Sequence, residues 1–113
     1  MDVLEVQRLL LARDFRVRTG ALARGWWAIY TAVSDAPAVI IDGLGVVEKV
    51  DADISPGDMY LVVRITADDG TVRHYRVTGY WDSWDSRWDG HLHEVTPTTK
   101  LVTSFTVIDD DAA

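Results

Sequence analysis

The chain has 113 residues, of which 48% are hydrophobic and 26% charged, proportions typical of soluble globular domains, so we expect one domain over residues 1–113. Its net charge of −7 disfavours direct nucleic-acid binding, because phosphate contacts require Lys and Arg, and its lack of cysteine excludes disulfides and thiolate metal sites. No apolar run approaches the ~20 residues of a membrane span, and the segment Met1-Asp2-Val3-Leu4-Glu5 lacks the basic region of a secretory signal. We therefore expect a cytoplasmic protein that binds no membrane.

Residues from about 3 to 13 are predicted to form a helix. Asp2 and Glu5 have the spacing of a capping box, in which a side-chain oxygen accepts a free backbone N–H at the helix start. Apolar side chains recur at helical spacing through this segment; they are Val3, Leu4, Val6, Leu10 and Leu11. After the helix the pattern changes to period two at Phe15 and Val17, and we expect residues 15–108 to be rich in β-strands.

Residues 25–33 are dense in aromatic and β-branched side chains, and we predict a second strand there. Adjacent side chains of a strand point to opposite faces, so one of Trp26 and Trp27 would enter the core. Residues 39–50 are also β-rich, and their glycines at 43 and 45 indicate a hairpin or a bulge. Residues 51–57 are polar and are predicted to form a loop.

The clearest hairpin runs from residue 59 to residue 81 around the turn Asp68-Asp69-Gly70. A two-residue Asp-Gly turn would mix the apolar and polar faces of the two strands. We therefore predict a three-residue loop with Gly70 in the left-handed conformation, which keeps the apolar side chains together. This register pairs Val63 with Tyr75 and Leu61 with Val77. The polar face then carries Arg64, Thr66, His74, Arg76 and Thr78.

The remainder of the chain is predicted to hold an aromatic and acidic loop at residues 79–90, a short strand at 91–95, a final strand at 100–108 and an acidic tail at 109–113. One helix followed by closely spaced strands indicates an α+β fold. We expect the N-terminal helix to pack on a twisted antiparallel β-sheet of about five or six strands.

The loop at residues 79–90 is the predicted binding site, because large aromatic side chains seldom stay on a surface unless they bind a partner or fold onto the core. The candidate binding residues are Trp81, Asp82, Trp84, Asp85, Arg87 and Trp88. In one interpretation the tryptophans close one end of the core. In another, Trp84 and Trp88 anchor a protein interface that their charged neighbours orient. A third interpretation is stacking of a sugar on the tryptophan faces.

The sequence contains no Ser/His/Asp arrangement, paired-carboxylate motif or phosphate-binding glycine loop, so we expect neither enzyme activity nor a cofactor. His91 and His93 lie two apart on a predicted strand and would share one face. Together with His74 they are the candidate ligands of a zinc site, and a metal-dependent enzyme is the corresponding alternative function. The aspartates at 82, 85 and 89 do not have the spacing of an EF-hand calcium loop.

Residues 79–97 hold a spaced motif whose fixed positions are Gly79, Tyr80, Ser83, Trp88, Asp89, Gly90, Glu94, Val95 and Pro97. This motif resembles the pattern Gly-Tyr-Tyr-x-Ser-Tyr, Trp-Asp-Gly and Glu-Val-x-Pro of small proteins of tailed phages and prophages. Trp81 and Trp84 stand where that pattern has tyrosine. The resemblance covers roughly the C-terminal half of the chain and implies a phage setting.

Taken with the composition of the loop, the resemblance predicts a small accessory protein that acts by protein–protein binding in the host-cell cytoplasm. Its partner would be a host or phage protein, with inhibition of a host or antiviral-defence component as one expected role, or a second copy of the chain in a homodimer. The alternative function is a virion-associated or carbohydrate-binding module that uses the same loop.

Overall fold

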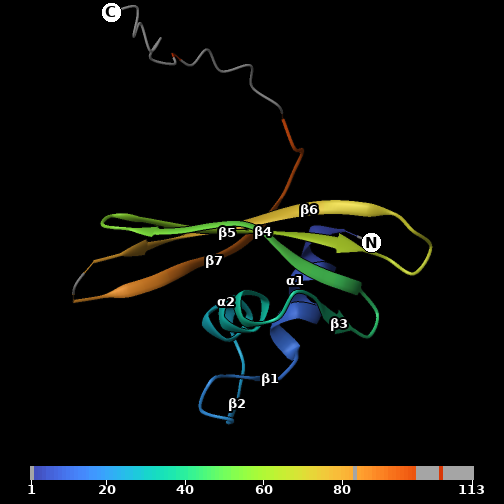
Figure 1. Cartoon of the computed structure of the whole chain (residues 1–113), viewed down its shortest axis with the longest axis horizontal. Coiled ribbons are helices and arrows are strands. Elements are labelled where there is room, and N and C mark those ends of the chain that lie inside the picture. Colours follow the sequence, from blue (N-terminus) through green and yellow to red (C-terminus); the bar gives the residue numbers. More distant parts are fainter. Residues whose placement is uncertain (1, 83, 99–104, 106–113) are drawn as a thin grey trace, which may run out of the picture.

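The computed structural model describes residues 2–82, 84–98 and 105. Its elements are α1 (Val3–Ala12), β1 (Phe15–Arg16), β2 (Leu22–Ala23), α2 (Trp26–Asp35), β3 (Val39–Ile41), β4 (Gly45–Ser55), β5 (Asp58–Thr66), β6 (Val72–Trp81) and β7 (Ser86–Val95). Both helices lie on one side of the large sheet, with the β1–β2 hairpin beyond them (Figure 1). The fold is α+β with the N-terminal helix packed against an antiparallel sheet, as the sequence predicted.

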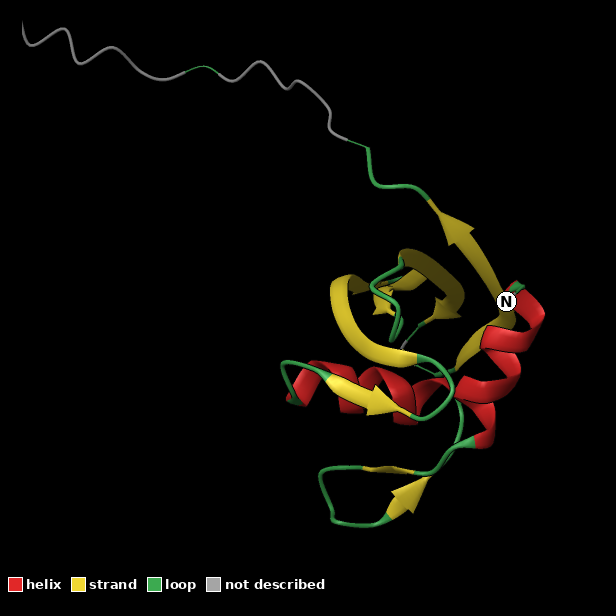
Figure 2. Ribbon diagram, turned by 90° about the vertical axis from the view of Figure 1, so that its right-hand side faces the viewer, coloured by secondary structure: helices red, strands yellow, loops and turns green. Residues whose placement is uncertain are grey.

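The main sheet has five strands in the order β3-β4-β5-β6-β7, and every neighbouring pair is antiparallel. Consecutive strands are therefore neighbours throughout, and the sheet is strongly curled (Figure 2). The strand predicted at residues 91–95 forms the second half of β7. The predicted strand at residues 100–108 and the predicted tail at 109–113 lie outside the described residues, apart from Phe105.

Helix α1 confirms the first predicted element. Asp2 is its N-cap, and the Asp2 side chain accepts the backbone N–H of Glu5 at 2.8 Å. The Glu5 carboxylate accepts a hydrogen bond from Arg8 at 2.9 Å, one turn along the helix. Val6 and Leu10 are the buried residues of this helix, one turn apart on the face toward the sheet.

The β5–β6 hairpin confirms the predicted three-residue loop. Val63 is paired with Tyr75 and Leu61 with Val77, and all four side chains are buried. The backbone N–H of Ala67 donates to the carbonyl oxygen of Thr71 at 2.9 Å, which closes the loop across residues 68–70. Gly70 has φ +87°, a conformation that other residues adopt only at a cost.

The strand predicted at residues 25–33 is wrong, because these residues form helix α2. Its buried side chains are Trp26, Ala28, Ile29 and Val33. The positions 26, 29 and 33 follow the helical repeat rather than alternation. Trp26 and Trp27 consequently do not point to opposite sheet faces: Trp26 is 8% exposed and Trp27 is 39% exposed on neighbouring sides of one helix. The aromatic and β-branched composition was a weaker signal than the spacing.

The loop predicted at residues 51–57 is wrong for most of its length, because β4 continues to Ser55. Asp51 pairs with Val62 and Asp53 with Tyr60, while Ala52 and Ile54 alternate with them. A register shift between Lys49 and Asp51 marks a bulge in β4. The two aspartates therefore occupy strand positions that alternate with half-buried apolar residues, which the polar composition concealed. The hairpin predicted within residues 39–50 is present as the β3–β4 connection.

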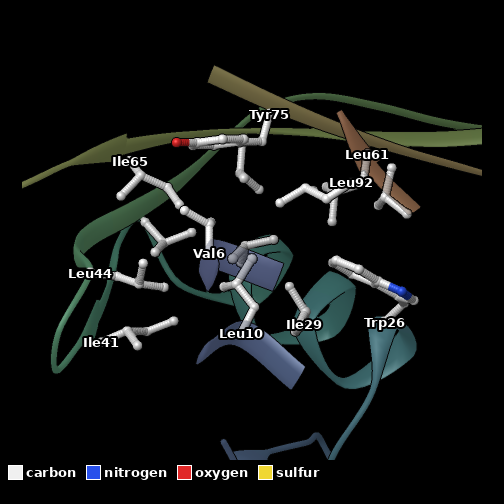
Figure 3. Packing of buried hydrophobic residues seen from close by; sticks show 14 of the residues in the cluster. Val6, Leu10, Trp26, Ile29, Ile41, Leu44, Leu61, Ile65, Tyr75 and Leu92 are labelled. Atoms are coloured by element: carbon white, nitrogen blue, oxygen red, sulfur yellow. The ribbon is translucent and has the colours of Figure 1, made fainter. Parts of the chain in front are cut away.

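One hydrophobic cluster joins both helices to the sheet (Figure 3). The most deeply buried large side chains come from α1, α2 and three strands of the sheet; they are Leu10, Ile29, Val47, Met59, Leu61 and Val77. Burial of such aliphatic side chains is the main stabilising contribution expected in a chain of this size. Within the described part of the chain, neither helix has the length and apolarity needed to cross a bilayer.

Candidate functional site

The aromatic segment predicted as a loop is the β6–β7 hairpin. Strand β6 runs on to Trp81 and β7 begins at Ser86, and these two residues are paired. Tyr80 lies opposite Arg87 and Gly79 opposite Trp88. The prediction of a loop from residue 79 to residue 90 is therefore wrong except at its centre. Cross-strand pairing places alternate aromatic side chains on opposite faces of the hairpin, which a linear sequence does not reveal.

Asp82 organises the turn between the two strands. Its Oδ1 accepts the backbone N–H groups of Trp84 at 2.8 Å and Asp85 at 2.7 Å, and its Oδ2 accepts the Tyr80 hydroxyl at 2.8 Å. The Asp82 N–H donates in turn to the carbonyl oxygen of Asp85 at 2.8 Å. These interactions fix the backbone on both sides of the turn, in the way that aspartate commonly stabilises turns.

The same hydrogen bonds shift two acid–base equilibria. The N–H of Trp84, the hydroxyl of Tyr80 and the N–H of Asp85 stabilise the carboxylate and lower the pKa of Asp82. The hydrogen bond to Asp82, together with its negative charge, raises the pKa of Tyr80. At neutral pH the pair is therefore an ionised aspartate that accepts from a neutral phenol, and the turn is built around a negative charge.

Trp84 extends from this turn into solvent and is 95% exposed. A tryptophan side chain is among the largest apolar groups in proteins, and exposed ones are enriched in binding interfaces. Its own backbone N–H and that of Asp85 are both bound by Asp82, so the exposed side chain lies next to backbone that Asp82 holds. Among the predicted site residues, Trp84 has the position expected of an interface anchor.

Trp88 takes the opposite role. Its ring meets that of Trp27 on α2 edge to face with centroids 5.2 Å apart, and lies 6.1 Å from that of Tyr30. Trp88 packs against the hydrophobic cluster, and its Nε1 is buried without a hydrogen-bond partner among the described residues. The interpretation that a tryptophan of this segment packs onto the core therefore holds for Trp88, whereas Trp84 is exposed to solvent. Trp81 is half-buried.

Gly79 explains how Trp88 and its strand approach so closely. A Cβ at position 79 would lie 2.5 Å from the carbonyl oxygen of Arg87 and 2.6 Å from Cε of Met59, distances that no side chain tolerates. A register shift between Val77 and Gly79 marks a bulge in the same ladder. In that bulge Asp89 accepts the Thr78 hydroxyl and the N–H of His91. The glycine and the bulge set the position of β7 against β6.

A shallow groove lies on the sheet beside the turn. It is lined by Asp58, Thr78, Gly79, Tyr80, Arg87 and Asp89. Asp58 comes from the start of β5, and the preceding residue, Gly57, donates its N–H to the carbonyl oxygen of Trp81 at 2.6 Å. This bond holds the β4–β5 turn against the β6–β7 hairpin. The groove therefore combines residues far apart in the sequence, and of its lining only Arg87 was among the predicted binding residues.

The candidate zinc ligands do not meet. His74 is paired with Val95 and His93 with Arg76, whereas His91 lies beside the bulge. Within residues 2–82, 84–98 and 105, no group of three His, Cys, Asp or Glu side chains could hold a metal ion. Asp82 and Asp89, considered as calcium ligands, instead accept hydrogen bonds from the hairpin itself.

The fold and the hairpin thus define an α+β protein in which Trp84 is exposed at the β6–β7 turn. Comparison of the chain with protein-family models, curated proteins and solved structures gave no match. The features of the chain that bear on its function are therefore the chemistry of the hairpin and the sequence motif of residues 79–97.

Proposed function

We propose that this chain is a non-enzymatic, phage-type accessory protein that binds a protein partner through the β6–β7 turn, with Trp84 as the anchor. The observation that carries the proposal is the 95% exposure of Trp84 on a turn that Asp82 holds by two backbone hydrogen bonds. The partner is a host or antiviral-defence protein whose activity the binding inhibits in the host cytoplasm. The phage setting rests on the motif of residues 79–97.

The hydrogen bonds of Asp82 favour binding for a thermodynamic reason. Association costs free energy whenever a loop or a side chain must be ordered in the complex, and each immobilised side chain costs about 0.5–1.5 kcal/mol. Here the backbone N–H groups of Trp84 and Asp85 are already bound by Asp82. Burial of the indole in a partner therefore adds apolar contact with little further ordering, as in interfaces that depend on one or two aromatic anchors.

The carbohydrate-binding alternative has less support from the geometry. Sugar binding by this segment requires aromatic faces that are open to the ligand together with convergent polar groups. Trp88 is occupied by its contact with Trp27, and Asp82 by three hydrogen bonds within the turn. Trp84 offers one almost fully exposed ring at the turn, which suits insertion into a pocket of a protein better than a stacking platform.

The proposal is tested with two variants, each of which replaces one exposed apolar side chain by alanine. Trp84→Ala removes the anchor, and Leu4→Ala removes another exposed apolar side chain, 73% exposed on α1. Affinity capture from a lysate of host cells should recover a partner with the native chain and with Leu4→Ala, and lose it with Trp84→Ala. Thermal unfolding should give the same midpoint for all three proteins. A partner retained equally by Trp84→Ala would contradict the proposal.

A second copy of the chain is distinguished by mass. Because an exposed aromatic patch can bind itself across a two-fold axis, light scattering coupled to size-exclusion chromatography measures whether the native chain is a dimer. A dimer that dissociates in Trp84→Ala and persists in Leu4→Ala would assign the turn to self-association instead of to a foreign partner.

A further inference from the structure

The groove beside the turn specifies the chemistry of the partner. We propose that it receives an arginine side chain from the protein that Trp84 anchors, so that the bound segment carries a guanidinium group next to an apolar pocket for the indole. This inference rests on the proposed function and deepens it, because it names what the partner must present. It depends on residues of the groove other than Trp84, and the two proposals can fail separately.

Two carboxylates stand in the groove. Asp89 is held by the Thr78 hydroxyl and the His91 N–H, and although its partial burial acts in the opposite direction, these hydrogen bonds lower the pKa of Asp89. Asp58 lies at the first position of β5, exposed to solvent. Asp82 and Asp85 lie in the turn alongside. At neutral pH this end of the sheet is therefore strongly negative, and a cation is the complementary ligand.

The shape and the aromatic wall of the groove fit a planar cation. Its lining includes the backbone of Gly79, and Tyr80 is 42% exposed beside it. The Tyr80 hydroxyl is engaged by Asp82, so the phenol is fixed in place. Guanidinium groups stack on aromatic rings and bind carboxylates through paired N–H donors, whereas an ammonium acts as a point charge. An arginine side chain could therefore stack on the Tyr80 ring and bind the carboxylates of the groove.

Arg87 is the positively charged residue among those that line the groove. It lies across the ladder from Tyr80 and lines the same groove, and it forms no ion pair within the described part of the chain. A cationic ligand would meet the two carboxylates, Asp58 and Asp89, and be repelled by this one guanidinium. Removal of Arg87 should consequently strengthen the binding of a cation, which is a result that a merely structural role of this residue would not produce.

The probe is a short peptide, acetyl-Gly-Arg-Gly-Arg-Gly-amide, compared with its counterpart in which neutral citrulline replaces arginine. Titration into isotopically labelled protein, followed by amide chemical shifts, should move resonances of the groove and the turn with the arginine peptide alone. Asp58→Asn should weaken the binding by about threefold, the scale of an exposed ion pair, and Arg87→Gln should strengthen it by about twofold. Higher salt should weaken it, because exposed charges are screened.

The matched control is Asp68→Asn, which removes an identical charge from the exposed β5–β6 turn at the other end of the strands. It should leave the affinity unchanged. Equal binding of the citrulline peptide, equal effects of the Asp58 and Asp68 variants, or no binding of the arginine peptide would each overturn the inference. A captured partner that needs Trp84 but not Asp58 would overturn this inference alone and leave the proposed function intact.

Discussion

The rings of Trp27 and Trp88 meet edge to face with centroids 5.2 Å apart, and this contact ties helix α2 to the edge strand β7. Trp27 is 61 residues before Trp88 in the chain, and their contact turns one of the tryptophans of the β6–β7 hairpin toward the helix layer. Trp84, four positions earlier, meets no such helix and stays in solvent. The position of α2 therefore explains why Trp88 is packed and Trp84 is exposed.

Truncation of these two tryptophans should therefore have opposite consequences. Trp88→Ala should lower the free energy of unfolding by about 2–4 kcal/mol, because it leaves a cavity between the sheet and α2. Trp84→Ala should change it by less than about 0.5 kcal/mol. Urea denaturation followed by circular dichroism measures both values without dependence on tryptophan fluorescence. Equal destabilisation by the two variants would show that Trp84 also supports the fold.

Gly79→Ala should destabilise the protein more than an ordinary glycine substitution in a strand. The added Cβ would lie 2.5 Å from the carbonyl oxygen of Arg87 and 2.9 Å from Cα of Trp88, so the β6–β7 ladder must separate. We expect a loss of about 2 kcal/mol or more and faster amide exchange at Trp88. Full stability of the variant would contradict the close packing of these strands.

Gln7 should stabilise the edge of β7 by acting as a hydrogen-bond acceptor. Its Oε1 accepts the backbone N–H of Leu92 at 2.9 Å, and the contact is partly buried. Gln7→Ala should lower stability by about 1–2 kcal/mol, because the donor loses its partner, and should accelerate hydrogen exchange of the Leu92 amide. Gln7→Glu, which keeps an acceptor oxygen, is the control and should preserve most of the protection.

The β6–β7 turn should respond to acid. The pKa of Asp82 is lowered in the folded state by the N–H of Trp84, the hydroxyl of Tyr80 and the N–H of Asp85. A lowered folded-state pKa contributes stability above the unfolded value of about 3.9, and this contribution is lost as the pH falls through the folded-state value. The amide resonances of Trp84 and Asp85 should shift together in that window. Asp82→Asn should remove the transition, and an unchanged titration in that variant would contradict this assignment.

At the alkaline end Tyr80 should show the complementary behaviour. Its hydrogen bond to Asp82, and the charge of that carboxylate, raise the pKa of Tyr80. The neutral phenol should therefore persist above the ordinary tyrosine value of about 10, and its contribution to stability should be lost as the pH rises through the folded-state value. Spectrophotometric titration of phenolate in the native chain and in Asp82→Asn measures the difference, which should disappear in the variant.

The periodicity of apolar residues was sufficient to predict the elements whose contacts are local in the sequence. The helix at Val3–Ala12 follows from its apolar stripe and from Asp2, and the β5–β6 register follows from alternation on two strands that share one short turn. Both signals are local, since a helical face or a hairpin register depends on side chains within about twenty positions. Composition, by contrast, gave the wrong prediction for α2. Its aromatic and β-branched residues favour strands in isolation, but its buried residues at positions 26, 29 and 33 follow the helical repeat.

The sequence by itself determined that residues 79–90 concentrate aromatic and acidic side chains. Only the tertiary structure decided which of these side chains are exposed and which are packed. Cross-strand pairing placed Trp84 at the tip, the close approach at Gly79 and the contact with Trp27 turned Trp88 inward, and β5 brought Asp58 beside the hairpin. Burial depends on elements that are distant along the chain, so no local pattern can distinguish an exposed residue from a packed one when both are tryptophan.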